Sequence, residues 1–276
     1  MNILGEIAER TRERIAQEKK RVSPAAIRRE AELAQSMGCM RTDCELPYEP
    51  CAFEKALGTP GVSFICEVKK ASPSKGLIAP DFPYLQIAQE YEQAGAAAIS
   101  CLTEPYYFQG QDAYLREIAQ MVRIPVLRKD FTVDEYMIYQ ARAFGAGAVL
   151  LICSILDDGQ LRAYGQLAQE LGLSALVEAH TEQEVDRAMR ADARILGVNN
   201  RDLKTFQVDL GTSARFRRMV PPEVLFVSES GIRNADDIRK LAENGTNAVL
   251  IGETLMRAAD KKAMLRELRG EAQNGA

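Results

Sequence analysis

The chain has 276 residues, of which 46% are hydrophobic, enough to build the core of one large domain or two small ones. Its 35 basic and 39 acidic residues leave a formal net charge of -4. Proteins whose main partner is nucleic acid usually carry a strong basic excess, so nucleic acid is not expected as the main partner of this chain. Six cysteines lie scattered without a CxxC pair, and there is one histidine, so neither a zinc site nor another metal site is expected.

The first 60 residues are expected to form an N-terminal helical extension. Residues 2–20 and 23–35 each read as an amphipathic helix, the second with Ser23 as N-cap and Pro24 in its first turn. Their charged side chains either face solvent or help to shape the mouth of the main domain. The charged N-terminus lacks the apolar core of a signal peptide, and no 18 apolar residues run together, so we expect a cytoplasmic protein without a membrane partner.

The rest of the chain, residues 61–276, repeats one pattern of structure. Short apolar runs rich in β-branched residues are typical of buried strands. Eight such runs occur, at 62–69, 96–103, 124–130, 147–154, 174–179, 194–200, 224–230 and 247–253. We predict one strand in each.

Helical patterns lie between these runs, and four of five inspected helix ends carry a glycine, the usual residue for a left-handed C-terminal turn. Thr181 with Glu184 predicts a capping box, and Asn234 predicts an N-cap. Strands that alternate with helices must run parallel, because each crossover returns the chain to the same end of the sheet. Eight units in this length predict an α/β fold, a (β/α)8 TIM barrel, which would form a single catalytic domain with the N-terminal extension.

A doubly wound open sheet is the structural alternative. Its usual fingerprint is a glycine-rich turn directly after the first strand. Here Gly145 and Gly147 precede a strand instead of following one, so this context argues against a dinucleotide-binding fold.

Polar side chains gather at the carboxyl ends of the predicted strands, where a barrel of this type builds its active site. Glu67 and Lys69 are two residues apart, so they share one face of their strand and would enter the mouth together or form an ion pair above the core. The other such residues are Lys129, Asp130, Glu178, Asn199, Arg201, Ser230 and Glu253. Each alone could be a structural polar group, but together they favour an active site over a binding scaffold.

Two strand ends suggest a phosphate site. Residues 228–232 and 250–255 place Gly231 and Gly252 just after the seventh and eighth strands, where such barrels hold phosphate on backbone N–H groups. Ser72 and Ser74, beside Lys75, would close this site from the first loop. His180, a lone histidine just after Glu178, is expected to be an ordinary loop residue. The cysteines are expected to be small core residues, with Cys66 and Cys101 inside strand runs.

Seven segments together resemble indole-3-glycerol phosphate synthase, in the order expected for that family and from about residue 3 to 260. They are CEVKKASPSKGLI, LTEPYYFQG, VLRKDF, LVEAH, GVNNRDLKTF, VSESGI and LIGETLM. SESGI and LIGE also occur in other phosphate-binding barrels, whereas KKASPSKG with RKDF and NNRDL is specific.

The resemblance implies a reaction that closes 1-(2-carboxyphenylamino)-1-deoxyribulose 5-phosphate to indole-3-glycerol phosphate, with loss of carbon dioxide and water and without cofactor or metal. It implies Lys129 as general acid, and Lys69 as partner of the substrate carboxylate with a role in dehydration. It implies Glu178 as base or stabiliser of a cationic intermediate, and Glu67 and Asn199 as residues that orient hydroxyls. How proton transfers divide between the two lysines stays open.

The resemblance also implies the residues and partners for binding. The substrate and phosphate contacts would come from Ser72, Arg201, Glu229, Ser230, Gly231, Gly252 and Glu253, the last chiefly through its backbone. The partner would be a small phosphorylated molecule, with transient contact to other enzymes of the tryptophan pathway. Two lysines near one mouth lower each other's pKa and carboxylates raise it, so the sequence leaves the sign of the shift open.

Three alternatives remain at this point. A phosphoribosylanthranilate isomerase would be expected to offer a cysteine base where this chain has EVKK, and the α subunit of tryptophan synthase lacks KKASPSKG. A non-catalytic phosphate-binding or interaction protein is the third. The presence of Glu67, Lys129 and Glu178 counts against it.

Overall fold

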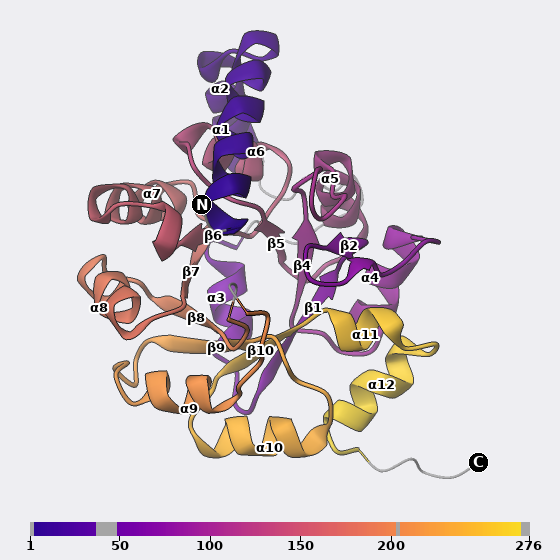
Figure 1. Cartoon of the computed structure of the whole chain (residues 1–276). Coiled ribbons are helices and arrows are strands. Elements are labelled where there is room, and N and C mark those ends of the chain that lie inside the picture. The colour runs from indigo at the N-terminus through magenta and orange to yellow at the C-terminus, as the bar shows by residue number, and fades with distance from the viewer. Residues whose placement is uncertain (1–2, 37–48, 203–204, 272–276) are drawn as a thin grey trace.

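The structure is a computed structural model that describes residues 3–36, 49–202 and 205–271 (Figure 1). Eight parallel strands form a closed barrel in the order β1-β10-β9-β8-β7-β6-β5-β4. They are β1 (Ser63–Val68), β4 (Ala98–Leu102), β5 (Val126–Lys129), β6 (Ala148–Ile152), β7 (Ser174–Ala179), β8 (Ile195–Asn199), β9 (Leu225–Glu229) and β10 (Ala248–Ile251). Each lies within one of the eight runs predicted from the sequence, so the predicted barrel is confirmed.

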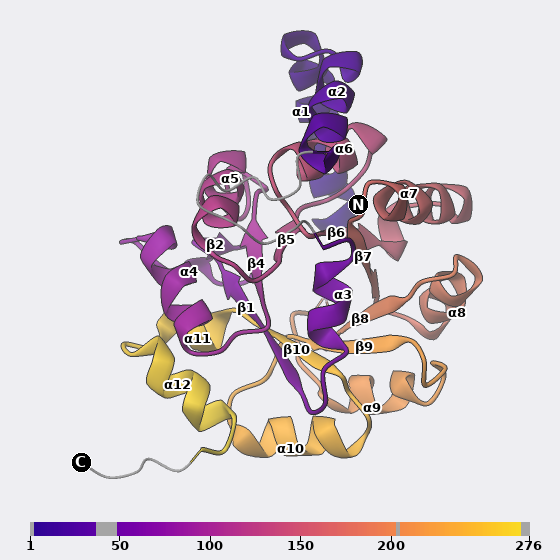
Figure 2. The same ribbon diagram turned by 180° about the vertical axis from the view of Figure 1, so that it is seen from behind.

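Helices surround the barrel, as Figures 1 and 2 show. Those that follow the strands are α4 (Tyr84–Gln93), α5 (Asp112–Met121), α6 (Glu135–Ala143), α7 (Asp158–Glu170), α8 (Glu182–Arg190), α9 (Gly211–Arg217), α10 (Ala235–Glu243), α11 (Glu253–Arg257) and α12 (Lys261–Leu268), with the 3-10 turn η1 (Cys153–Ile155) after β6. The loop after β1 forms a hairpin of β2 (Ala71–Ser72) and β3 (Gly76–Leu77), which the sequence analysis did not anticipate.

The helix ends follow the sequence signals closely. Positive φ angles occur at the four expected turn glycines and at Asp192 in the fifth turn, where φ is 58°. Asn234 caps α10 as predicted, through its side chain and the N–H of Asp237. The capping box at α8 is only half formed, because Thr181 accepts from the N–H of Glu184 but the Glu184 carboxylate accepts from the N–H of His180.

Side chains that point into the barrel alternate along each strand with side chains that point toward the helices. On β1, Ile65 belongs to the inner core, whereas Phe64, Cys66 and Val68 pack in the outer layer. Glu67 follows Ile65 on the inner face and therefore lies at the mouth. Cys66 is buried, as is Cys101 on β4, which confirms their prediction as core residues.

The remaining cysteines are only partly described. Cys153 is buried as predicted, whereas Cys51 is only half-buried, so the prediction of a core residue is wrong for Cys51. Both are free thiols, like Cys66 and Cys101, while Cys39 and Cys44 lie outside the described residues.

Three N-terminal helices complete the fold. α1 (Ile3–Arg21) and α2 (Pro24–Ser36) extend beyond the ring in Figure 1, with α2 packed along α6. α3 (Ala52–Leu57) closes the opposite end of the barrel, where Phe53 and Leu57 join the inner core (Figure 2). Leu4 and Ile7 of α1 also join that core from the mouth side. Among the described residues, no helix combines the length and the apolar character needed to cross a membrane.

Candidate active site

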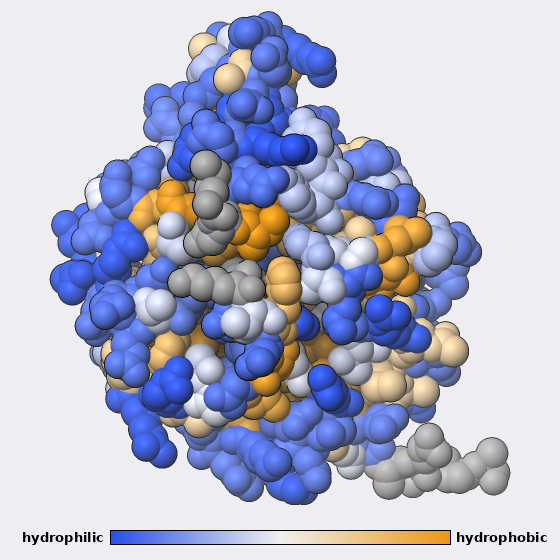
Figure 3. Space-filling view, in the orientation of Figure 1, coloured by the Kyte–Doolittle hydropathy of each residue, from blue (hydrophilic) through white to orange (hydrophobic). Residues whose placement is uncertain are grey.

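A cavity of about 530 Å³ opens at the carboxyl ends of the strands. Figure 3 shows apolar surface near the middle of this face, within a mostly hydrophilic exterior. All twelve residues expected in the site line the cavity: Glu67, Lys69, Ser72, Lys129, Glu178, Asn199, Arg201, Glu229, Ser230, Gly231, Gly252 and Glu253. They come from the ends of β1, β5, β7, β8, β9 and β10 and from the following loops, which is why they converge although they are far apart in the sequence.

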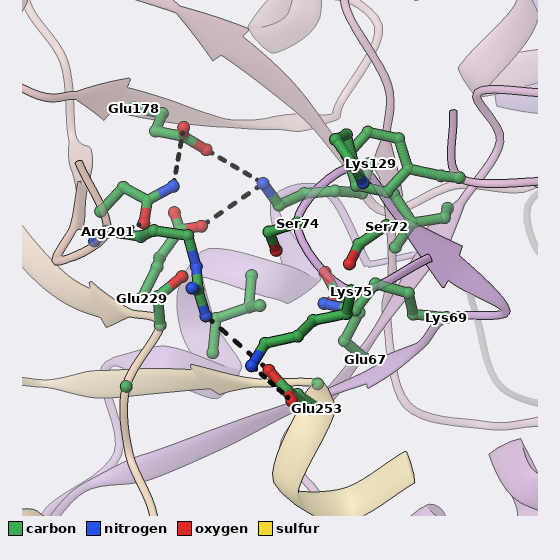
Figure 4. Close-up of a pocket in the computed structure, with 18 of the residues that line it drawn as sticks. Glu67, Lys69, Ser72, Ser74, Lys75, Lys129, Glu178, Arg201, Glu229 and Glu253 are labelled. Atoms are coloured by element: carbon green, nitrogen blue, oxygen red, sulfur yellow. Dashed lines mark hydrogen bonds and ion pairs between the residues drawn. The ribbon is translucent and has the colours of Figure 1, made fainter. Parts of the chain in front are cut away.

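Lys129, the last residue of β5, lies between two carboxylates. Its Nζ is 2.9 Å from Glu178 Oε2 at the end of β7 and 3.4 Å from Glu229 Oε2 at the end of β9 (Figure 4). Burial disfavours the ammonium, but Glu178, Glu229 and Glu67 outweigh burial and raise the pKa of Lys129 above its usual range. The sequence left open whether the pKa of Lys129 is raised or lowered. In the structure the neighbouring carboxylates raise it.

The two carboxylates next to Lys129 differ in their ionisation. For Glu178, burial raises the pKa, but Lys129 and His180 dominate and lower it. For Glu229, burial and the negative charges of Glu178 and Glu67 outweigh Lys129 and raise the pKa to about 7. Glu229 Oε1 is buried and has no hydrogen-bond partner among the described residues. Of the two carboxylates next to Lys129, Glu178 thus favours the charged form, whereas Glu229 takes up a proton more readily.

Glu67 and Lys69 enter the mouth together and contact each other as an ion pair. Both side chains are largely buried, so this pair also covers the top of the barrel core. On the other side of the cavity, Asn199 donates its Nδ2 to Glu178 Oε1 at 3.4 Å, and its Oδ1 accepts from the backbone N–H of Arg201. Asn199 therefore links the ends of β7 and β8.

The expected phosphate region lies where the loops after β1, β9 and β10 meet. Ser230 and Gly231 both have positive φ angles, of 66° and 89°. A Cβ on Gly231 would lie 2.2 Å from Cγ1 of Val208, so only glycine fits this turn. Gly252 directly precedes α11.

The side chain of Glu253 forms ion pairs that the sequence did not indicate. Its carboxylate lies 3.4 Å from Lys75 Nζ and 3.7 Å from Arg201 Nη2 (Figure 4). These cations reach the region from the loops after β1 and β8. The side chain of Glu253 therefore competes for the charges that a phosphate would contact.

One wall of the cavity is apolar. Phe108 and Phe131 line it with ring centroids 6.3 Å apart, and Ile3, Leu4 and Ile7 of α1 add to it. This wall was not identified from the sequence, because aromatic residues in loops carry no periodic signal. It gives the cavity a surface suited to an aromatic ring beside the charged groups.

Asp130 anchors α1 to the loop after β5. Its carboxylate accepts from Arg14 Nη2 at 2.8 and 3.0 Å, from Thr103 Oγ1 at 2.7 Å and from the N–H of Phe131 at 2.8 Å. Arg128 lies 3.6 Å away. Burial raises the pKa of Asp130, but the two arginines outweigh it and lower the pKa. The sequence identified Asp130 as a strand-end residue but gave no indication of Arg14 as its partner.

His180 lies in the turn between β7 and α8, as expected for a loop residue, but its imidazole is not an ordinary loop side chain. It is only 14% exposed, and its Nε2 lies 3.0 Å from Glu178 Oε1. The available signal was only its place two residues after Glu178, just beyond the end of β7.

Comparison with known proteins gives a consistent result. A family model described as indole-3-glycerol phosphate synthase matches residues 4–268. A protein of that name from Ruminiclostridium cellulolyticum is 53% identical over 270 residues, covering 98% of this chain and 100% of its own length. Another from Lachnoclostridium phytofermentans is 51% identical, covering 97% of this chain and 98% of its own. The solved 3-hexulose-6-phosphate synthase from Salmonella typhimurium matches 76% of this chain and 97% of its own with a TM-score of 0.63 at 13% identity, a likeness of fold alone.

Proposed function

We infer the activity of this chain from the premise that it belongs to the indole-3-glycerol phosphate synthase family. The reaction is a ring closure in tryptophan biosynthesis that converts 1-(2-carboxyphenylamino)-1-deoxyribulose 5-phosphate to indole-3-glycerol phosphate, carbon dioxide and water. The chain is thus a carboxy-lyase. The observation that carries the mechanism below is the position of Lys129 Nζ between Glu178 and Glu229 in the mouth.

The first chemical step forms a carbon–carbon bond. The ring carbon that carries the carboxylate attacks the substrate carbonyl, and the carbonyl oxygen takes a proton as negative charge develops on it. We assign this proton to Lys129. The raised pKa of Lys129 keeps its ammonium protonated at neutral pH, so it transfers a proton only to a strongly basic group such as the developing alkoxide.

The second step breaks the bond to the carboxylate, releases carbon dioxide and restores the aromatic ring. The new hydroxyl then leaves as water, which needs an acid at the hydroxyl and a base for the proton that the five-membered ring loses. Glu178 is charged and suited to act as that base or to stabilise the cationic intermediate. Glu229, with a pKa of about 7, is suited to return a proton to Lys129.

The remaining residues bind and orient the substrate in this proposal. Lys69 pairs with the substrate carboxylate and is the second candidate acid for the loss of water, while Glu67 and Asn199 orient the hydroxyls. The phosphate dianion is held by backbone N–H groups near Ser230, Gly231 and Gly252, with Ser72, Arg201 and Lys75 as further contacts.

α1 supplies part of the same cavity, through Ile3, Leu4 and Ile7. We therefore propose that the extension of residues 1–60 and the barrel of residues 61–276 work as a single catalytic domain. Cytoplasmic localisation and transient contact with other enzymes of the tryptophan pathway stay predictions. Cell fractionation tests the first, and co-sedimentation of the purified enzymes tests the second.

The direct test offers the purified chain two substrates in separate reactions. With 1-(2-carboxyphenylamino)-1-deoxyribulose 5-phosphate, we expect indole fluorescence to rise with one equivalent of carbon dioxide released. With phosphoribosylanthranilate, the substrate of the isomerase alternative, we expect no turnover. Turnover of the second substrate alone, or of neither, contradicts the proposed function.

A further inference from the structure

His180 connects the carboxylate of Glu178 to the first turn of α8. Its Nε2 lies 3.0 Å from Glu178 Oε1, and its Nδ1 lies 3.5 Å from Glu184 Oε2. The backbone N–H of His180 also donates to Glu184 Oε2 at 2.7 Å. The backbone N–H of Glu184 donates to the cap Thr181 Oγ1, whereas its carboxylate contacts His180.

The two contacts determine which protonation state of the ring fits this place. Both ring nitrogens are buried, and neither forms a hydrogen bond of good geometry with a described residue, so their nearest polar groups are the two carboxylates that they contact as ion pairs. A neutral imidazole has one N–H donor and one acceptor nitrogen, and the acceptor would then face a carboxylate oxygen. Only the doubly protonated imidazolium presents a donor to both Glu178 and Glu184. The charge on this ring follows from its two neighbours.

The contacts of Glu178 show what this charge does for the site. Its Oε2 faces Lys129 Nζ at 2.9 Å, while its Oε1 faces Asn199 Nδ2 and the His180 ring. Among the described residues that line the cavity, Glu178 is present and His180 is not. His180 therefore reaches the substrate only through Glu178.

We propose that His180 is a positioning residue, a buried imidazolium that Glu184 fixes to α8 and that holds the Glu178 carboxylate charged and aimed at Lys129. This inference rests on the proposed function, since it concerns how Glu178 performs its role there. The contacts then run from Glu184 on α8 through His180 in the turn after β7 to Glu178 and Lys129.

The electrostatic surroundings support a charged ring. Burial lowers the pKa of His180, but the carboxylates of Glu178 and Glu184 outweigh burial and raise it to about 10. The titratable groups that face the ring are Glu178 from β7 and Glu184 from α8. Lys129 of β5 lies beyond Glu178, Cys153 of η1 and Arg187 of α8 lie next to Glu184, and Asp158 of α7 pairs with Arg187.

The protonation of His180 is measurable without any assay of activity, because it is the only histidine in the chain. The imidazole C2–H resonance of the tag-free protein is followed by NMR from pH 5 to pH 10.5. We expect a midpoint near 10, and a midpoint lower by more than about one unit in Glu178→Gln, which removes the charge facing Nε2. A wild-type midpoint near 6.5, the value of a free histidine, overturns the proposal.

Two variants separate positioning from simple structural support. His180→Gln keeps one N–H donor but removes the charge, and we expect kcat to fall about tenfold or more with KM changed less than about twofold. Thr181→Ala is the matched control, since it removes the cap of α8 without touching Glu178; we expect a lower melting temperature and an unchanged kcat.

Equal kcat losses in both folded variants, or an unchanged kcat in His180→Gln, contradict the positioning role. The proposed function fails separately, through absence of turnover by the wild-type chain. A wild-type chain that turns over but has a histidine titrating near 6.5 refutes only the role of His180.

Discussion

Gly252→Ala should damage catalysis while leaving the fold almost untouched. Gly252 has a φ angle of -116°, so alanine meets no left-handed strain there. The new Cβ would lie 2.3 Å from Glu67 Oε1 and 2.8 Å from Lys69 Nζ. Nonbonded atoms normally approach to about 3.5 Å, so the Glu67 carboxylate must move by about 1 Å. These atoms are the ends of flexible side chains, and their displacement costs little stability.

We expect the same displacement to slow the reaction, because the proposed function assigns the Glu67 carboxylate and the Lys69 ammonium to it. A misplacement of about 1 Å typically lowers turnover about a hundredfold, which corresponds to about 2.7 kcal/mol in activation free energy. The assay is kcat and KM from indole fluorescence, together with the free energy of unfolding, which we expect to change by less than about 1 kcal/mol.

Gly165→Ala on α7 is the matched control, since a Cβ there has no neighbour within 4 Å. We expect its kcat to be unchanged and its stability to rise by up to about 1 kcal/mol, because alanine favours helix. Wild-type kcat in Gly252→Ala would refute the assignment of Glu67 and Lys69 to the reaction.

Three further predictions concern other parts of the site. Glu178→Gln should lower kcat more than it raises KM, because its carboxylate meets positive charge mainly along the reaction path; a pure KM effect would make Glu178 a binding residue. In calorimetry with inorganic phosphate, Ser72→Ala should weaken binding less than about tenfold and Gly231→Val severely, and equal losses in folded variants would contradict a site built on backbone N–H groups. Asp130→Asn should lower the free energy of unfolding by about 3 kcal/mol at pH 7, because buried Arg14 loses its closest counter-charge and keeps only the longer contact with Glu18, at 3.9 Å. Since folding lowers the pKa of Asp130, its stabilisation is present above about pH 3.9 and lost as the pH falls through its folded pKa, so the two denaturation curves should converge in acid; a constant difference would argue against this ion pair.

The strands and the positions of the polar residues were predictable from the sequence for a local reason. A buried parallel strand needs a continuous apolar run, so each strand is visible without knowledge of its neighbours. The spacing of Glu67 and Lys69 then predicts a shared face, because side chains alternate along a strand. Turn glycines such as Gly145 mark the helix ends in the same local way.

The pairing of the charged groups was not predictable, because it depends on the closure of the barrel. Lys129 and Glu229 are 100 residues apart in the sequence, and nothing local indicates that Lys129 lies between Glu229 and Glu178. The sign of the pKa shift of Lys129 follows from that pairing and was therefore open as well. His180 was interpreted as a loop residue for the same reason, since the significance of its position depends on where Glu178 points.

The most direct test of the central claim compares the wild-type chain with Lys129→Ala in the same turnover assay, using 1-(2-carboxyphenylamino)-1-deoxyribulose 5-phosphate. We expect the wild-type chain to form indole-3-glycerol phosphate. In a variant that is still folded by circular dichroism, we expect turnover to be lower by roughly a hundredfold or more, the usual scale for the loss of a general acid. Near-normal turnover in the folded Lys129→Ala variant would contradict the claim that this lysine, held between two carboxylates, donates the proton for ring closure.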